Sequence, residues 1–406
     1  MNPTKPSSAR LRRALGTPLL TLYGLGVTVG AGIYVLIGTT AAEAGPYAAV
    51  SFLIAAAVVA FTAFSYAELS TRYPVSGGEA AYIQAGFGAA WLATVTGLAV
   101  ASSGIVSASA VAIGAASYLQ ALTFAPHGLL TMLIVATMGA IALWGITQSV
   151  TVAAIITVIE ISGLIFVIAW GFGVTEPNGV ALEAMLPPVG GAHWTGIASA
   201  SLLAFFAFVG FEDMANVAEE VKDPVRTMPQ AIIWTLVLTT ILYIGTTSAV
   251  LFAVPLASLA ASAAPLILVF QTAPESVKQA FSLVAIVATI NGVLIQTIMA
   301  SRVIYGLADR GQLPAFLAWV SHRTKTPVPA TIGVVLFIMV LSQILPIDDL
   351  AAHTSQIVLV VFMLVNVALI RLKVSRQQPA EHFRVPMVVP VFGLLTSVLL
   401  LGTSFL

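Results

Sequence analysis

The hydrophobic residues of this chain form long continuous runs instead of alternating with polar residues. Two of these runs, Tyr47–Phe64 and Ile232–Phe252, are apolar almost throughout, over about the 20 residues that an α-helix needs to cross a bilayer. A transmembrane β-barrel would need shorter segments in which apolar and polar residues alternate. Because spanning segments must satisfy their backbone polar groups internally, the pattern predicts an all-α polytopic membrane protein.

Eleven segments fit this pattern and are joined by short polar connectors. They are 17–41, 47–69, 81–120, 128–147, 151–173, 195–218, 230–254, 280–308, 328–345, 353–371 and 386–406. The segment 81–120 is longer than one upright helix requires, so we expect it to tilt or to begin with an interfacial turn near Ala80–Phe87. The alanine-rich stretch Ala253–Pro265 is predicted to contain a short surface helix. No extramembrane domain fits between the crossings.

Composition agrees with this assignment, and the basic residues orient it. Hydrophobic residues make up 59% of the 406 residues and charged residues 8%, with a formal net charge of +0. Of the 16 Lys and Arg residues, 15 fall in the N-terminal tail or on one side of the predicted bundle, and only Lys278 lies on the other. The positive-inside rule then predicts a cytoplasmic N-terminus. The basic start resembles a signal peptide, but its apolar stretch is too long and lacks a cleavage site, so we expect it to be retained.

The first crossing is interrupted by glycine. The stretch Gly24–Gly32 carries four glycines with β-branched residues between them, which makes a poor helix. Unwound backbone within a membrane is tolerated only where it is packed in protein or lines a cavity. One interpretation is a binding site at Val27–Gly32, and the other is close helix packing through small residues.

The sixth crossing carries a second interruption, which favours the binding site. Phe205–Gly210 is apolar, and Glu212 and Asp213 follow well inside the segment, where each acid costs about 2.5 to 3.5 kcal/mol on insertion scales. Interrupted helices at corresponding places of two halves indicate a transporter's binding site. The N-terminus of a half-helix attracts a carboxylate, and exposed carbonyls accept hydrogen bonds from an ammonium group. The pair of interruptions therefore predicts a site for a solute that carries both groups.

Four ordered motifs resemble a known family. They are GVTVGAGIYVLIG in the first crossing, SYAELSTRYPVSGGEAAYI after the second, FFAFVGFEDMANVAEEVKDP in the sixth and ASRVIYGLADRGQLP after the eighth. Over residues 14–385 the chain resembles the amino acid, polyamine and organocation (APC) superfamily, in particular bacterial permeases related to cationic amino acid transporters. The resemblance implies a leucine-transporter-type fold of two inverted five-helix repeats. The expected parts are a cytoplasmic tail at 1–16, repeats at 17–173 and 195–371, and an additional transmembrane helix at 386–406.

The resemblance also assigns the substrate site. Backbone amides of the first interruption are expected to bind the substrate carboxylate, around Thr28, Gly30, Ala31 and Gly32. Carbonyls of the second are expected to receive its amine, at Phe206, Ala207 and Val209. Phe206 or Phe208 is expected to close over the substrate as an aromatic gate, although simple packing explains an aromatic at this spacing equally well.

Two buried acids are candidates for coupling. Glu160 is the only charge between Gln148 and Glu176 and lies near the middle of the fifth crossing; acids within a membrane are functional by default. Proton-coupled relatives carry a lysine there in place of a sodium ion, so their mechanism does not transfer directly. Glu160 is therefore interpreted either as a proton-coupling or cation-pairing group or as a structural hydrogen bond to a neighbouring helix. Glu212 corresponds to an acid linked to gating or proton movement in relatives.

Other polar residues allow weaker assignments. Five lie on predicted helices and either line the pocket or join helices to one another: Ser102, Ser103, Ser107, Asn291 and Gln296. Three flank an inner loop and suggest a conformational latch with Arg302 or Arg310: Glu68, Arg72 and Glu79. The chain has no cysteine, its five histidines are scattered, and nucleotide-binding and zinc-protease patterns are absent, so we expect no cofactor, no metal, no nucleic acid partner and no enzyme activity.

Together these features predict a secondary active transporter of amino acids in a bacterial inner (plasma) membrane, working by alternating access. Proton symport is the favoured drive, with amino acid exchange or export as the alternative. The expected partners are an amino acid, the proton and the lipid bilayer. A neutral substrate of small or medium size is expected, although Glu212 leaves cationic substrates open. The alternative class is a non-transporting amino acid sensor or receptor, and an embedded enzyme or a channel has less support.

Overall fold

The structure is a computed structural model that describes residues 15–75, 78–120, 122–144, 150–321, 323–324, 326–375 and 381–405. The predicted tail 1–16 lies almost entirely outside them. Across these ranges the chain forms helices and one isolated β-bridge, between Leu15 and Val221. Nine helices of the described part are long and apolar enough to cross a membrane. The prediction of an all-α polytopic membrane protein is thus confirmed.

The helices of the first half begin with two short pieces in place of one long helix. In chain order the α-helices are α1 (Thr17–Thr28), α2 (Ala31–Ala44), α3 (Ala48–Arg72), α4 (Gly78–Phe87), α5 (Ala90–Gln120), α6 (His127–Trp144) and α7 (Val150–Gly173). Short 3₁₀ turns follow α2 and α7, at Gly45–Tyr47 (η1), Leu182–Met185 (η2) and Gly191–His193 (η3).

The second half repeats this beginning. It comprises α8 (Trp194–Phe206), the 3₁₀ helix η4 (Phe211–Glu220), α9 (Pro224–Ala253), α10 (Leu256–Ala260), η5 (Pro265–Phe270), α11 (Glu275–Asp309), η6 (Ala315–Ala318), α12 (Val328–Ile344), α13 (Ile347–Val374), α14 (Val388–Gly402) and η7 (Thr403–Phe405). Each of the eleven predicted segments overlaps one of these helices.

Two local predictions are confirmed. The long segment 81–120 divides into α4 and α5, because the chain turns at Gly88, whose φ of +68° is a conformation that favours glycine. The stretch Ala253–Pro265 contains α10, which begins directly after Pro255, where proline cannot continue the preceding helix.

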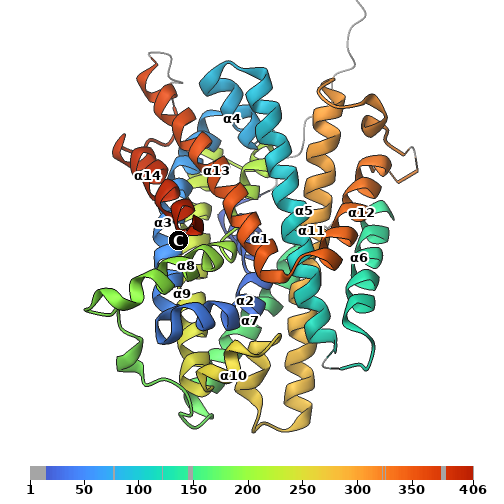
Figure 1. Cartoon of the computed structure of the whole chain (residues 1–406). Helices are drawn as coiled ribbons and strands as arrows, with labels where there is room; N and C mark the ends of the chain where they lie inside the picture. The colour runs from blue at the N-terminus through green and yellow to red at the C-terminus, as the bar shows by residue number, and fades with distance from the viewer. Residues whose placement is uncertain are drawn as a thin grey trace, which may run out of the picture.

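The helices pack as pairs drawn from the two halves of the chain. α5 packs along α11, α3 along α9, α2 along α8, and α6 along α12, and Figure 1 shows α6 and α12 together at one side of the bundle. α7 contacts α1, α9 and α11, whereas α13 contacts α8, α3 and α5. α4 and α10 lie at opposite ends of the bundle (Figure 1), which we call the α4 end and the α10 end.

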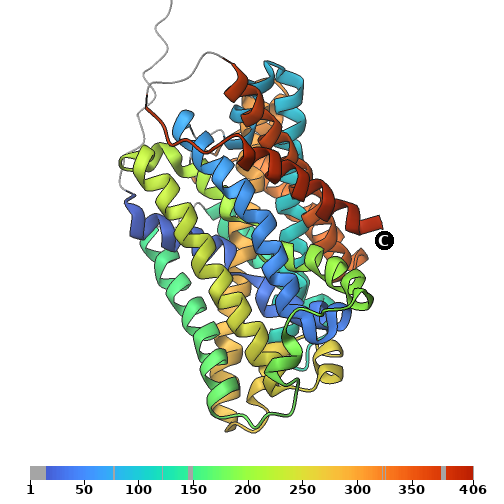
Figure 2. The same cartoon turned by 90° about the vertical axis from the view of Figure 1, so that its left-hand side faces the viewer.

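α14 lies at the edge of the bundle and packs on α3 and α13, as the turned view in Figure 2 shows. The outer faces of the helices carry large exposed apolar side chains, for example Ile155, Phe337 and Leu399, each more than half exposed. An apolar surface of this extent is unusual on a soluble monomer. In a bilayer it contacts lipid at no cost.

Candidate functional site

The first crossing is interrupted between α1 and α2. α1 ends at Thr28, and the Gly30 amide donates to the Thr28 carbonyl at 3.0 Å, which turns the chain tightly. The Thr28 hydroxyl donates back to the Gly24 carbonyl at 2.8 Å and so stays on its own helix. α2 starts after Gly30, which offers no side-chain cap. The first amides of α2, from Ala31 and Gly32 onward, therefore have no capping side chain. The first N–H groups of an α-helix have no acceptor within the helix itself. The side chain of Ala31 lies outside the described part.

The sixth crossing is interrupted between α8 and η4. α8 ends at Phe206, the amide of Val209 donates to the Phe206 carbonyl at 3.1 Å, and η4 starts at Phe211. Between them Gly210 has a φ of +124°, and a Cβ there would lie 2.7 Å from the Val27 carbonyl oxygen of α1. Both conditions require glycine. The second interruption is thus shaped by close approach to the first.

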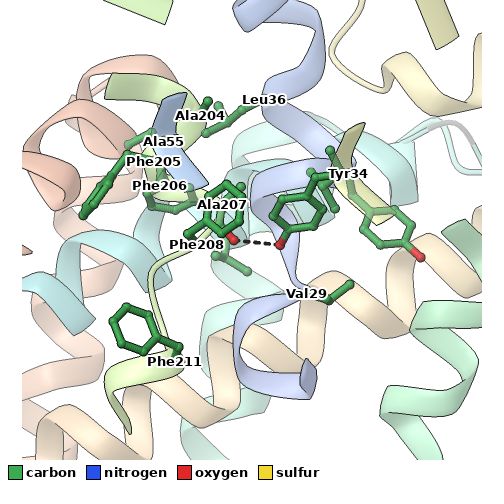
Figure 3. Close-up of a cluster of buried hydrophobic side chains, with 14 of the residues drawn as sticks. Val29, Tyr34, Leu36, Ala55, Ala204, Phe205, Phe206, Ala207, Phe208 and Phe211 are labelled. Carbon is green, nitrogen blue, oxygen red and sulfur yellow. Dashed lines mark hydrogen bonds between the residues drawn. The ribbon is translucent and has the colours of Figure 1, made fainter. Parts of the chain in front are cut away.

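The two interruptions pack directly on each other. A Cβ at Gly32 would lie 2.4 Å from the Cα of Ala207, so the start of α2 touches backbone at the end of α8. The hydroxyl of Tyr243, on α9, lies 2.8 Å from the Thr28 carbonyl and 2.7 Å from the Ala207 carbonyl. Figure 3 shows Val29, Ala207 and the neighbouring phenylalanines around this point. One tyrosine therefore joins the backbones of both interruptions.

The aromatic residues of the second interruption are buried. Phe206 is 5% exposed and Phe208 is 1% exposed, and the Phe208 ring packs edge-on against Tyr243 with ring centroids 5.0 Å apart. Among the carbonyls expected to receive an amine, that of Phe206 already accepts from Val209, and that of Ala207 accepts from Tyr243. A role of either ring as a gate remains a prediction.

Glu160 lies on α7 within the protein interior. Its side chain is fully buried, and one oxygen accepts from the Asn291 amide of α11 at 3.4 Å. Tyr34 of α2 donates to the main-chain carbonyl of Glu160 at 2.8 Å. The other carboxyl oxygen has no hydrogen-bond partner among the described residues. Both interpretations remain open: the contact with a neighbouring helix exists, and a free oxygen is left for a proton or a cation.

A pocket lies between the second interruption and the α4 end. Its cavity volume is about 10 Å³, about the space that one water molecule needs. Apolar residues of α5, α11 and α13 form part of the wall. The polar lining comes from α3, α4, α5, η4 and α11: Tyr66, Glu79, Ser103, Glu212, Asp213 and Gln296. Glu212 accepts from the Gly210 amide at 2.9 Å, and Tyr66 donates to Glu79 at 3.1 Å. The pocket thus gathers three carboxyl groups.

The pocket contains only some of the predicted residues. Ser103, Gln296, Val209 and Glu212 line it, whereas the predicted residues of the first interruption, Asn291 and Ser107 do not, and Ser102 is exposed. Glu79 was predicted only as part of a latch, but it lines the pocket. It lies on α4, which is too short to cross a membrane. Burial raises the pKa of its carboxyl above the ordinary value of 4.5. Its position after a tight turn gave no signal of this contact.

Glu68 does not pair with either predicted latch partner in this structure. Arg302 and Arg310 are exposed. Glu68 is fully buried and binds Arg72 and Lys373 at 2.5 Å each, and its carboxylate also accepts from the Val385 amide at 2.8 Å. These contacts fasten the end of α13 and the connector before α14 to the end of α3.

The opposite end of the bundle is joined by one polar contact between α2 and α13. The Thr39 hydroxyl donates to the Asp348 carboxylate at 2.9 Å. It lies on the half of α2 that packs on α10, so it lies at the other end of the bundle from the acidic pocket.

Comparisons with known proteins agree on one family. Residues 15–406 match the sequence profile of the family described as amino acid permease. The branched-chain amino acid permease BcaP of Bacillus subtilis (strain 168) is 31% identical over 95% of this chain and 86% of its own length. The vacuolar cationic amino acid transporter 2 of Arabidopsis thaliana is 30% identical over 90% of this chain but only 60% of its own length. The methylthioribose transporter of Bacillus subtilis (strain 168) is 29% identical over 95% of this chain and 87% of its own.

Proposed function

Since the chain belongs to the amino acid permease family of the APC superfamily, we propose that it is a secondary active transporter that holds an amino acid between its two interrupted helices. The observation that carries this proposal is the direct packing of the interruptions, at Gly32 against Ala207. The uncapped start of α2 offers N–H groups to the substrate carboxylate. The carbonyls of Phe206 and Ala207, at the end of α8, already accept from Val209 and Tyr243, and the second lone pair of each would receive the ammonium group. Phe206 or Phe208 then closes the site.

Alternating access is supported by the pairing of helices from the two halves. If repeats 17–173 and 195–371 are inverted copies, α7 corresponds to α13, and the partners α1, α9 and α11 of α7 correspond to α8, α3 and α5. α13 does contact all three, in addition to α4 and α14. In transporters built this way, one repeat unit moves against the other around a fixed central site. We propose the same arrangement here, with α14 as an added helix.

The energy source is proposed to be the proton gradient. Glu160, fully buried beside α2 and α11, has a free carboxyl oxygen close to the helix that begins at the first interruption. Protonation there would change the interaction of α7 with α11, which Asn291 makes with this carboxyl group. Glu212 lies next to the second interruption and binds the Gly210 amide, so its protonation would release the backbone of that turn. Exchange of one amino acid for another is the alternative drive.

The basic residues support a bacterial inner membrane location with the N-terminus and the α4 end in the cytoplasm, because the positive-inside rule places Lys and Arg there. In this orientation the acidic pocket lies on the cytoplasmic side of the interruptions. The Thr39–Asp348 contact lies on the outer side.

Reconstitution into liposomes tests the proposal. Counterflow of radiolabelled amino acids should be saturable in the wild type, and an imposed inward proton gradient should drive uptake. Glu160→Gln keeps the hydrogen-bonding shape and should abolish the response to the gradient while counterflow persists. Glu183→Gln, on the exposed η2 turn, is the matched control and should respond as the wild type does. Binding of amino acids without any flux would identify a sensor and refute the transporter.

A further inference from the structure

α1 and α9 lie side by side, and polar contacts join them in a nearly constant register. Three hydrogen bonds connect residues 213 to 215 positions apart: Thr17 with Gln230 at 3.2 Å, Thr21 with Thr235 at 3.4 Å and Thr28 with Tyr243 at 2.8 Å. They lead from the exposed Gln230, near the start of both helices, to the first interruption, over about 20 Å of α9. The seam between α1 and α9 is therefore polar along its length.

Unpaired hydroxyl groups are concentrated on these two helices. Among the described residues, four buried threonine hydroxyls have no hydrogen-bond partner, and all of them lie on α1 or α9: Thr21, Thr239, Thr246 and Thr247. Threonines of other helices, such as Thr131 and Thr289, donate to the carbonyl four residues earlier on their own helix. Buried polar groups are nearly always paired, either with protein or with ordered water. The unpaired hydroxyls of the seam therefore suit water.

Helical spacing fits one water molecule between successive hydroxyls. Thr235, Thr239 and Tyr243 follow one another four residues apart on α9, so their Cβ atoms lie about 5–6 Å apart along one face. A water molecule that makes two hydrogen bonds of about 2.8 Å spans a gap of this size. In the register of the seam, Thr239 lies opposite Gly24–Gly26 of α1, a stretch without a polar side chain. The middle of the seam thus has a hydroxyl that only water can pair.

The inner end of the seam lies close to Glu160. α7, which carries Glu160, packs on both α1 and α9. Thr157, one turn before Glu160, is fully buried, and a Cβ added at Gly26 of α1 would collide with its hydroxyl oxygen. Tyr34 and Tyr243 are titratable groups that act on Glu160 electrostatically, and none of the ion pairs of the described residues includes it. The second carboxyl oxygen of Glu160 thus stands one helical turn from the seam without a protein partner.

We propose that the α1–α9 seam binds a file of ordered water molecules, along which the proton of Glu160 leaves toward the α4 end. The inference rests on the proposed proton coupling and deepens it by naming the route. The O–H bond of the protonated Glu160 carboxyl breaks, and its proton passes to the nearest water molecule. Each water passes one proton on, and the last releases hydronium near Thr17 and Gln230. Glu160 is left as a carboxylate.

Tyr243 separates this file from the outer half of the seam. Its hydroxyl lies between the carbonyls of Thr28 and Ala207, so its single proton is held there and does not pass along the row. Thr246 and Thr247 lie beyond it, toward the α10 end. The file therefore leads from Glu160 to the α4 end alone and does not let protons cross the membrane without substrate.

Thr239→Val tests the route, because it removes the hydroxyl and keeps the shape of the side chain. In liposomes that enclose a pH-sensitive dye, amino acid uptake driven by an inward proton gradient should release protons into the lumen at least tenfold more slowly than in the wild type. Counterflow at equal pH needs no proton release and should stay within twofold. Thr240→Val is the matched control, because its hydroxyl donates to the Leu236 carbonyl of its own helix at 2.7 Å. Thr21→Val, on the opposite wall, should slow the same step and gives a second reading if Thr239→Val does not fold.

Radiolytic footprinting tests for the water itself. Hydroxyl radicals that X-rays generate from bound water oxidise a buried methionine where that water lies next to it, and the product is methionine sulfoxide. Met214 is fully buried, and its sulfur lies 3.8 Å from the Thr235 hydroxyl of the seam. It should be oxidised at least fivefold faster than Met138 of α6, although Met138 is the more exposed of the two at 9%. Thr239→Val should reduce this difference.

Two results would overturn the inference: proton release in Thr239→Val as fast as in Thr240→Val, or oxidation of Met214 no faster than that of Met138. Either one leaves the proposed transporter intact, because gradient-driven uptake by the wild type is measured in the same liposomes. Amino acid uptake without any proton movement refutes the coupling and the route together. Absence of all flux refutes the transporter, and the footprint of Met214 then still decides whether the seam binds water.

Discussion

Replacing Tyr243 by phenylalanine tests the joint between the two interruptions. The hydroxyl has one proton and lies within hydrogen-bond distance of two carbonyls, those of Thr28 and Ala207. The Thr28 carbonyl also accepts from the Gly30 amide, so it keeps a donor after the substitution. The Ala207 carbonyl loses the donor described for it. One buried carbonyl left unpaired costs about 1–3 kcal/mol, and the ring of phenylalanine preserves the packing on Phe208.

The free energy of unfolding, measured by denaturant titration in mixed micelles, should therefore fall by about 1–3 kcal/mol in Tyr243→Phe. Tyr47→Phe is the matched control, because this ring lies on the η1 turn, half-buried against His193, and its change should be within about 0.5 kcal/mol of zero. A loss in Tyr243→Phe no larger than in this control would show that the hydroxyl does not join the interruptions.

Three further substitutions test other contacts. Gly32→Ala forces a Cβ to within 2.4 Å of the α8 backbone and should abolish the monodisperse peak in size-exclusion chromatography, whereas Gly30→Ala, which meets nothing within 4 Å, should keep it. Glu68→Gln removes the carboxylate that pairs with the buried Arg72 and the partly buried Lys373 and should lower the free energy of unfolding by about 3–5 kcal/mol. Asp223→Asn, in an exposed pair, should change it by less than about 1 kcal/mol. Burial raises the pKa of Glu79 above 4.5, so the folded state holds this proton more tightly than the unfolded chain does. Its stabilising contribution is complete below pH 4.5 and is lost as the pH rises through the raised pKa. The thermal midpoint of Glu79→Gln should therefore fall less steeply with pH over this range than the thermal midpoint of the wild type. Parallel curves for the two proteins would contradict this.

Local features of the fold could be predicted from the sequence. The glycines of Gly24–Gly32 lower helix propensity where they stand, and the excess length of 81–120 required a turn, which α4 and Gly88 supply. Such features depend on neighbouring residues alone. The sequence therefore located the interruption of the first crossing to within a few residues.

Contacts between distant segments could not be predicted in the same way. The partner Lys373 of Glu68 lies far along the chain, and the sequence suggested Arg302 or Arg310 instead. Tyr243 stands in an ordinary apolar helix, and its hydroxyl acquires a role only because α9 passes both interruptions. Glu79 meets Glu212 and Asp213 through the folding of α4 against the bundle. In each case the tertiary arrangement, and not the local pattern, decides the chemistry.

The contact of Gly32 with Ala207 has a mechanical consequence. With backbone against backbone and no side chain between them, α2 and α8 have no compressible layer through which one can slide past the other, so we expect them to turn as a single rigid lever. In the proposed transport cycle this lever is expected to separate from α13, and the Thr39–Asp348 hydrogen bond would then span the moving boundary. A covalent cross-link between α2 and α8 should accordingly be tolerated throughout the transport cycle. A cross-link between positions 39 and 348 should arrest the transport cycle. Because the sequence has no cysteine, a pair of introduced cysteines suffices to make either cross-link.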